Sequence, residues 1–498
     1  MRSESRQVSV CDGQLLGVQI EVREEAHVGR VRGISTAVFV LVILAGRVSP
    51  VVAAPEGQVT WGIHISLAPT WFDPAETTGI VTPFMVMYAL HDAMVKPLPG
   101  NPLAPSLAES WTVSADGLAH EFLIRKDVRF HNGDPVTSED VKFSFERYRG
   151  AASKAFKDRV AAVETPAPNR VRFRLKAPWP DFLTFYSSAT GAGWIVPKKY
   201  VEKVGDDGFK KAPIGAGPYR FVSFTPGVEL VLEAVDRYWR KTPPVKRLVF
   251  RTIPDPATRF AALKRGEVDV SYWMTASIGE ELRRTPGLTL KPSLANNSYW
   301  VYFVDQWDPK SPWHDRRVRL AANYAIDRQA INQAETLGFS RMTYITCDAV
   351  HSGIAEPVAN DLQAAGIRVK LRALERAAYN KGQVEKTFKN LVLSASAAFG
   401  NAPTRLEAFV AGGGAYVYGS YPDIDGLFRE QAAELDKKRR EVMLHRIQQL
   451  VYEKAMFAPI YQFAAMGGYG PRLEESGLGL ITGFPFSGPY EDVKLKAH

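Results

Sequence analysis

A segment in the last fifth of the chain places an aromatic ring, an amide and a guanidinium close together, at Phe399, Asn401 and Arg405. No Asp or Glu occurs between Glu385 and Glu407. A guanidinium can donate two parallel hydrogen bonds to a carboxylate or phosphate, so Arg405 is a candidate contact for an anionic group. The other interpretation of Arg405 is a solvated helix start just before Glu407. The chemistry that this segment indicates is ligand binding.

Aromatic residues at other positions could stack on a bound solute. Trp300 and Tyr302 lie on the alternating run 299–304, and Trp71 precedes an Asp-Pro pair. Alternation is typical of a strand, so the other interpretation is that these rings cover one face of a sheet. The residues that we expect to contact a ligand are Trp71, Trp300, Tyr302, Phe399, Asn401 and Arg405.

The sequence contains no pattern typical of an enzyme active site. It has no G-x-S-x-G elbow, no P-loop, no H-E-x-x-H and no C-x-x-C pair. Its nine histidines are scattered without the spacing of metal ligands. We therefore predict no catalytic residue, no directly ligated metal and no cofactor.

The charge of the chain does not indicate a nucleic-acid partner. Its 62 basic and 53 acidic residues are interleaved, and the formal charge of +9 is not gathered into a long positive block. We interpret this charge as a solubility feature and expect no nucleic acid among the partners. The content of 46% hydrophobic residues is enough for more than one core.

The N-terminal part has the layout of a secretory signal. An apolar run over 34–46 follows two arginines and precedes small residues. This run is too short to span a bilayer, because a spanning helix needs about 20 apolar residues. We expect residues 30–54 to be a cleavable signal peptide, and residues 1–29 to be an extension or a misassigned start.

The two cysteines bear on localisation. Cleavage after Ala54 removes Cys11 and leaves Cys347 alone, so the mature chain can form no intrachain disulfide. No cysteine stands at the cleavage region to carry a lipid anchor. The expected location is therefore the periplasm, without a lipid anchor.

Strand and helix patterns alternate irregularly along the chain. Residues 170–176 alternate apolar and basic side chains, which predicts a half-buried strand, and 137–147 begins with a capping box. The pattern also predicts further strands and helices, the strands over 58–65, 120–125, 230–233 and 247–251, and the helices over 256–265, 315–334 and 436–454. Strands mixed with helices, without a strict βαβ repeat, indicate an α/β protein of several lobes.

Several strings resemble one family. They are LAESW at 107–111, DG at 116–117, VRFHNG at 128–133, TSEDVKFS at 137–144, GAGPY at 215–219, RFAALKRGEVD at 259–269, DRRVR at 315–319, AIDR at 325–328, AGIRV at 365–369 and YPDID at 421–425. Together they resemble the extracytoplasmic solute-binding proteins of family 5. That family includes the dipeptide-, oligopeptide- and nickel-binding components of ABC importers.

The resemblance implies an α/β, class II periplasmic binding protein fold, with two lobes and an additional inserted domain. On this basis domain I comprises 55–97, 208–305 and 455–498, domain II comprises 98–207, and domain III comprises 306–454. The implied function is the capture of peptides or peptide-like small solutes for import. The implied partners are the ligand and the permease subunits of an ABC importer in the inner membrane, and we expect a monomer.

Two features depart from the family pattern. The aspartate that pairs with the amino group of the ligand in peptide-binding relatives is absent from 394–405. Domain III is also shortened around 340–350, for which a natural deletion, a gene-model error and a degraded gene all remain open. Three alternatives to peptide capture follow: binding of a non-peptide solute such as a metal chelate, an inactive truncated member, and a secreted hydrolase, which the absence of a nucleophile–base set disfavours.

Overall fold

The described part of the chain opens on a strand that lies inside the largest sheet. The computed structural model describes residues 54–77, 81–150, 152–187, 190–341, 352–374, 376–397 and 401–497. Residues Ala54–His498 form one compact unit. The predicted segments 1–29 and 30–54 (apart from Ala54), the residue Phe399 and most of 340–350 lie outside the described residues.

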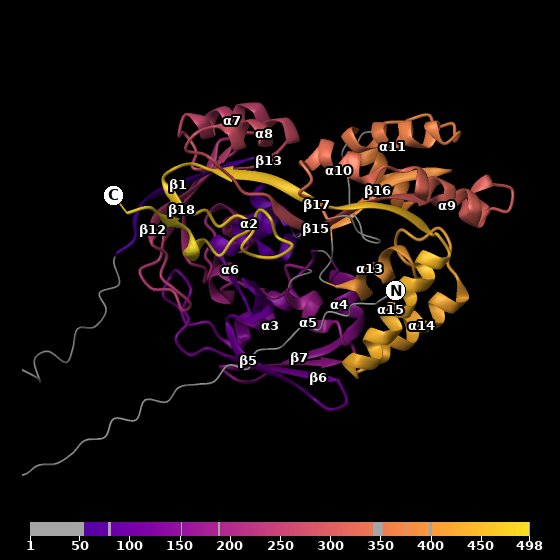
Figure 1. Cartoon of the computed structure of the whole chain (residues 1–498). Coiled ribbons are helices and arrows are strands. Elements are labelled where there is room, and N and C mark those ends of the chain that lie inside the picture. The colour runs from indigo at the N-terminus through magenta and orange to yellow at the C-terminus, as the bar shows by residue number, and fades with distance from the viewer. Residues whose placement is uncertain are drawn as a thin grey trace, which may run out of the picture. The chain divides into compact units, whose positions relative to one another are not determined.

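The largest sheet has nine strands in the order β10-β11-β12-β1-β13-β17-β15-β16, with β14 paired to β17. Strand β1 is parallel to β12 and β13, whereas the other pairs are antiparallel. The strands are β1 (Glu56–Ile63), β10 (Tyr219–Thr225), β11 (Glu229–Ala234), β12 (Val245–Thr252), β13 (Val270–Met274), β14 (Thr289–Leu290), β15 (Ser293–Phe303), β16 (Leu391–Ala397) and β17 (Phe457–Tyr469). The long strand β17 runs from β13 to β15 and so joins two parts of this sheet (Figure 1).

A second sheet has the order β5-β6-β8-β7, with β5 (Ala108–Val113), β6 (Ala119–Ile124), β7 (Val160–Ala167) and β8 (Arg170–Leu175). The predicted alternation over 170–176 is confirmed, because every second side chain of β8 is buried. On the opposite face Arg172 and Arg174 pair with the carboxylates of Glu121 and Glu164. Three small sheets pair β2 (Asp92–Ala93) with β9 (Trp194–Ile195), β3 (Val95–Leu98) with β4 (Asn101–Pro105), and β18 (Leu473–Glu475) with β19 (Lys494–Leu495).

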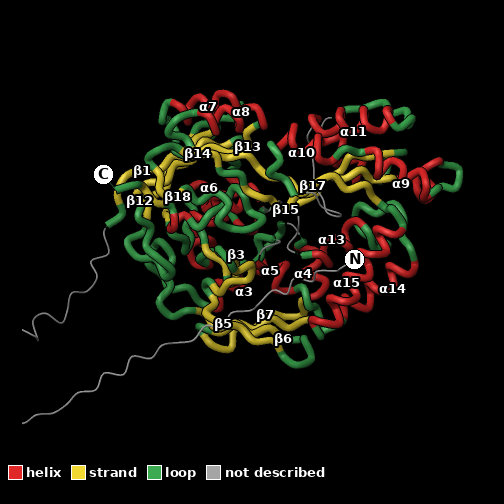
Figure 2. The backbone as a smooth tube through the Cα atoms, viewed as in Figure 1, coloured by secondary structure: helices red, strands yellow, loops and turns green. Residues whose placement is uncertain are grey.

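The helices of the described residues cover these sheets; for example, α3 and α4 pack against β7 (Figure 2). They are α2 (Val81–Leu90), α3 (Ser138–Glu146), α4 (Ser153–Arg159), α5 (Phe182–Ser187), α6 (Lys198–Lys211), α7 (Pro256–Lys264), α8 (Ala276–Arg284), α9 (Arg316–Ala325), α10 (Arg328–Thr336), α11 (Ser352–Ala364), α12 (Arg376–Val384), α13 (Ala402–Phe409), α14 (Pro422–Ala433) and α15 (Lys437–Glu453). Within the described ranges, none of these helices is both long and apolar enough to cross a bilayer.

The elements predicted from local sequence signals are present, with one correction. The capping box at the start of α3 is confirmed, because Thr137 and Asp140 exchange hydrogen bonds with each other's backbone N–H. The single helix expected over 315–334 is wrong. It is two helices, because Ile326 has extended backbone and the side chain of Asp327 accepts the N–H of Ala330 to cap α10.

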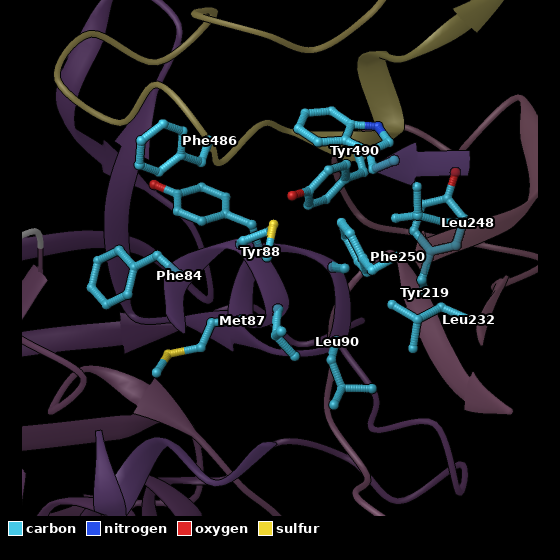
Figure 3. Close-up of a cluster of buried hydrophobic side chains, with 14 of the residues drawn as sticks. Phe84, Met87, Tyr88, Leu90, Tyr219, Leu232, Leu248, Phe250, Phe486 and Tyr490 are labelled. Atoms are coloured by element: carbon cyan, nitrogen blue, oxygen red, sulfur yellow. The ribbon is translucent and has the colours of Figure 1, made fainter. Parts of the chain in front are cut away.

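The core on one side of the largest sheet is built around α2. Residues 83–90 are all buried, as expected for a helix that is apolar on every side. Figure 3 shows Phe84 and Tyr88 of this helix facing Phe486 and Tyr490 from the C-terminal region, with Phe250 of β12 nearby. The chain end therefore belongs to the same core as the first strands.

Candidate functional site

One candidate surface lies where the parallel strands β1 and β13 end at the same edge of the sheet. His64 directly follows β1, and its ring stacks on Trp273 of β13 at a centroid separation of 5.5 Å. Phe463 and Phe486 also contact the Trp273 ring, at 5.4 and 4.9 Å. The carboxyl ends of parallel strands are the usual ligand edge of open α/β sheets. We call this set of four rings the His64–Trp273 face.

The backbone of Trp273 is strained. Its φ of 59° lies in the left-handed region, which a bulky side chain adopts only when the surroundings impose it. The surroundings that do so include Arg259, whose guanidinium donates to the main-chain carbonyls of Tyr272 (3.1 Å) and Trp273 (2.7 Å). Burial lowers the pKa of His64 to about 4, and the charge of Arg259 acts in the same direction. The face is therefore aromatic and uncharged at neutral pH.

A second candidate surface surrounds the first turn of α13 and gathers four of the six predicted ligand residues. Asn401 caps α13, with its side-chain oxygen accepting the N–H of Thr404, and Arg405 lies over the ring of Phe409 at 5.7 Å. Phe409 in turn contacts Trp300 at 5.3 Å. Tyr302 follows on the same face of β15 and shares the neighbour Phe457 with Trp300. We call Trp300, Tyr302, Asn401 and Arg405 the α13 set.

The α13 set is more deeply buried than a solvated sheet face. Trp300 is 2% exposed, Tyr302 is 3% exposed and Arg405 is 3% exposed. The indole N–H of Trp300 has no hydrogen-bond partner among the described residues, which is unusual for a buried donor. Burial raises the pKa of Tyr302 to about 12, and its hydroxyl accepts the N–H of Tyr418. These residues can offer a cation, an N–H donor and aromatic surface to an anionic or planar solute.

The two other predicted ligand residues do not join this set. Trp71 lies on the short helix η1 (Pro69–Phe72) and packs against the α2 core. Phe399 lies outside the described residues. Contact of all six side chains with a ligand stays a prediction.

Asp181, which precedes α5, was not among the residues predicted to lie at the site. Its carboxylate contacts Asn401 from the α13 set, although 220 residues separate the two in the chain. Beside it lies a cavity of about 200 Å³ between α4–α5 and α13–α14, lined by Asp158, Arg159, Lys176, Ala177, Pro178, Trp179, Asp181, Pro403, Glu407, Phe428, Gln431 and Ala432. The only sequence signal for this region is the Pro178-Trp179-Pro180 string, which favours an irregular turn. Among the described residues, no group of three or more His, Cys, Asp or Glu side chains could hold a metal ion.

Comparison with known proteins gives a family match over part of the chain. The sequence profile described as "Bacterial extracellular solute-binding proteins, family 5 Middle" matches residues 102–344, slightly less than half of the 498 residues. The chain therefore resembles the solute-binding proteins of family 5 over this range. It spans about half of the length of the curated relatives that it matches.

Three of those relatives are each 28% identical to this chain in the aligned part. Heme-binding protein A of Haemophilus influenzae aligns over 261 residues, which are 47% of this chain and 46% of that protein. Di/tripeptide-binding protein 2 of Pseudomonas aeruginosa aligns over 319 residues, 59% and 58% of the two chains. The dipeptide-binding protein of Escherichia coli aligns over 295 residues, 54% of each.

Solved structures confirm the predicted fold class of this chain. HbpA2 from Haemophilus parasuis matches with a TM-score of 0.74 and 20% identity, over 89% of this chain and 100% of that one. NikA from Brucella suis, in complex with Fe(III)-EDTA, matches with a TM-score of 0.75 and 19% identity over the same shares. The fold is therefore the mixed α/β fold of periplasmic binding proteins, whereas the predicted limits of its three domains stay a prediction.

Proposed function

We propose that this protein captures a small solute for an ABC importer. The observation that carries the proposal is the family 5 fold, which matches solute-binding structures over 89% of the chain. Relatives with this fold are named as heme-binding and dipeptide-binding proteins. The proposal includes that the protein is not an enzyme, acts as a monomer in the periplasm after removal of residues 30–54, and delivers its ligand to the permease subunits.

The proposed mechanism is closure on the ligand. A solute that contacts the His64–Trp273 face and the α13 set at once binds the closed arrangement more tightly than the open one. It therefore shifts the hinge equilibrium by its differential affinity. Strands β15 and β17 connect the two surfaces through one sheet, so they are the proposed place of bending.

Peptides or peptide-like solutes are the proposed ligand class. A specific observation favours a second candidate, a solute with a carboxylate and no free amine, such as an opine-like acid or a metal chelate. Arg405 is buried in the α13 set, and the segment 394–405, where the resemblance implies an aspartate for the amine, contains none. Solved relatives were crystallised with agropinic acid and with Fe(III)-EDTA.

A thermal-shift screen of the chain from Pro55 onward tests the proposal. The panel contains dipeptides, oligopeptides, amino acids, sugars, opine-like acids and nickel chelates. A ligand that binds only the folded state raises the unfolding midpoint by mass action. A shift with peptides supports the default class, and a shift only with amine-free acids or chelates moves the assignment to the second candidate. No shift with any compound contradicts the proposed function.

Replacing Arg405 by methionine is expected to weaken binding of a carboxylate-bearing ligand from that screen by about 30-fold or more. The reason is that a buried guanidinium makes charge-assisted hydrogen bonds worth about 2 kcal/mol, which methionine cannot make. Isothermal titration calorimetry measures the change. The control is Arg429→Met, because Arg429 is exposed on α14 and outside the α13 set. Equal affinities of the Arg405→Met and wild-type proteins would remove Arg405 from the site.

A further inference from the structure

The carboxylate of Asp181 is held by two residues from distant parts of the chain. Its Oδ1 accepts a hydrogen bond from Asn401 Nδ2 at 2.5 Å, and its Oδ2 pairs with the guanidinium of Arg440. Asn401 caps α13, and Arg440 lies in the first turn of α15. One carboxylate therefore ties the N-terminal ends of two helices to α5.

Both sides of this contact are rigidly mounted. Asp181 begins α5 by accepting the N–H of Phe185 at its main-chain carbonyl, and Phe182 is completely buried in the core of the four-stranded sheet. Across the contact, Arg440 Nε donates to the main-chain and side-chain oxygens of Gln431, at 3.2 and 3.1 Å. The Arg440 guanidinium is therefore held on its own side of the contact, which lowers the cost of ordering it when the two surfaces meet.

Burial distinguishes this pair from the neighbouring ion pair across the same contact. The side chains of Asp181 and Arg440 are 10% and 13% exposed, whereas those of Arg159 and Glu407 are 39% and 45% exposed. Exposed ion pairs contribute little, because water and salt screen them. Breaking a buried pair has a large effect, because it leaves one charge without its partner.

The surrounding contact is not packed like a continuous core. The cavity of about 200 Å³ lies directly beside Asp181 and is lined from both sides by charged and apolar groups. The cavity is partly open to solvent, which fits a contact between two surfaces that can meet and part better than a closed core. The contact around Asp181 therefore has the character of a separable interface.

We propose that Asp181 is a positioning residue that latches α13 and α15 against α5 and so places the first turn of α13, with Arg405, for ligand binding. Asn401 connects Asp181 to α13. Its side-chain oxygen caps α13 by accepting the N–H of Thr404, and its Nδ2 donates to Asp181. The consequence for ligand binding rests on the proposed function. The latch consists of protein side chains alone, so it can be measured separately from ligand binding.

The test measures the distance between spin labels in the ligand-free protein by double electron–electron resonance. The labels replace Lys154 of α4 and Val442 of α15, both of which are exposed, in a chain whose two native cysteines are serine. The variants are Asp181→Asn, Arg440→Gln and the double variant, and the matched control is Glu407→Gln. Thermal unfolding of each variant verifies that it is folded.

We expect the Asp181→Asn and Arg440→Gln proteins to gain a longer-distance population, at least about five-fold above wild type. The double variant should open no further than either single variant, because both remove the same interaction. Glu407→Gln should match wild type. A wild-type distance distribution in folded Asp181→Asn, or strictly additive opening in the double variant, overturns the latch. A failed ligand screen together with these distance changes contradicts the proposed function and leaves the latch intact.

Discussion

Replacing Arg259 by methionine is expected to lower the free energy of unfolding by about 4 kcal/mol. Arg259 is 1% exposed, and it donates hydrogen bonds to four main-chain carbonyls, those of Ile253, Pro254, Tyr272 and Trp273. Methionine fills a similar volume but leaves these four buried acceptors without their donor. Urea unfolding followed by circular dichroism measures the loss.

The matched control for Arg259 is Arg265→Met at the end of the same helix. Arg265 is 58% exposed and pairs only with the neighbouring Glu267, so its replacement should change the stability by less than about 0.5 kcal/mol. Because Arg259 also holds the strained backbone of Trp273, ligand affinity should fall with the stability of the Arg259 variant. A stability loss below 1 kcal/mol would show that water replaces the guanidinium.

Acidification from pH 7.5 to 5.5 is expected to lower the free energy of unfolding, and two buried histidines alone account for about 3 kcal/mol of this loss. Burial lowers the pKa of both His91 and His120 to about 4 in the folded protein. In the unfolded chain their pKa is near 6.5, so the unfolded state binds more protons between these values. Stability is therefore complete above about pH 7 and is lost progressively as the pH falls toward 4.

Other histidines act in the same direction. His64 and His131 also have their pKa lowered to about 4, chiefly by burial. The geometry at His131 explains the preference for the neutral ring, since Nδ1 accepts the N–H of Gly215 while Nε2 donates to the carbonyl of Gly217. In a charged ring, the proton on Nδ1 would point at the N–H of Gly215, so two donors would face each other.

Urea unfolding at pH 7.5, 6.5 and 5.5 measures this dependence. The comparison is with His91→Gln, whose amide can still donate to the carbonyl of Phe72 that His91 Nε2 contacts at 2.8 Å. Near pH 5.5, the slope of the free energy of unfolding against pH should correspond to the uptake of about one proton fewer on unfolding in this variant than in the wild type. An unchanged slope in His91→Gln would mean that His91 is charged in the folded protein.

Local patterns in the sequence were sufficient for elements whose cause is local. The alternation over 170–176 predicted β8, and the capping box at Thr137 predicted the start of α3. The prediction failed at 315–334, where apolar periodicity continues through Ile326. There the Asp327 cap ends one helix and starts another, and the family string AIDR contains that cap.

The family strings also contain residues whose role was not visible from spacing. Arg319, in the string DRRVR, is 2% exposed and donates to the carbonyls of Trp313, His314, Lys454 and Ala455. It fastens α9 to the end of α15 in the way that Arg259 fastens α7 to β13. An arginine surrounded by other charged residues looks solvated in the sequence, because two of its four acceptors, the carbonyls of Lys454 and Ala455, lie 135 and 136 residues along the chain.

The α13 set also has features that the sequence predicted and features that it did not. Alternation along 299–304 correctly places Trp300 and Tyr302 on one face of a strand, and the absence of acidic residues from 386–406 is a property of the sequence alone. That this face meets Arg405 through Phe409 was not predictable, since the contact joins β15 to a helix about a hundred residues later.

The sequence by itself determined the resemblance to family 5, the α/β class, several strands and helix starts, and the types of side chain available to a ligand. These depend on side-chain periodicity, on caps within one turn of helix and on strings of adjacent residues. Only the tertiary structure decided that Asp181 meets Asn401 and Arg440, that Trp273 has left-handed backbone, and that Arg259 and Arg319 are buried. The physical reason is that each of these depends on where distant segments pack, and packing is set by the whole core rather than by neighbours in the chain.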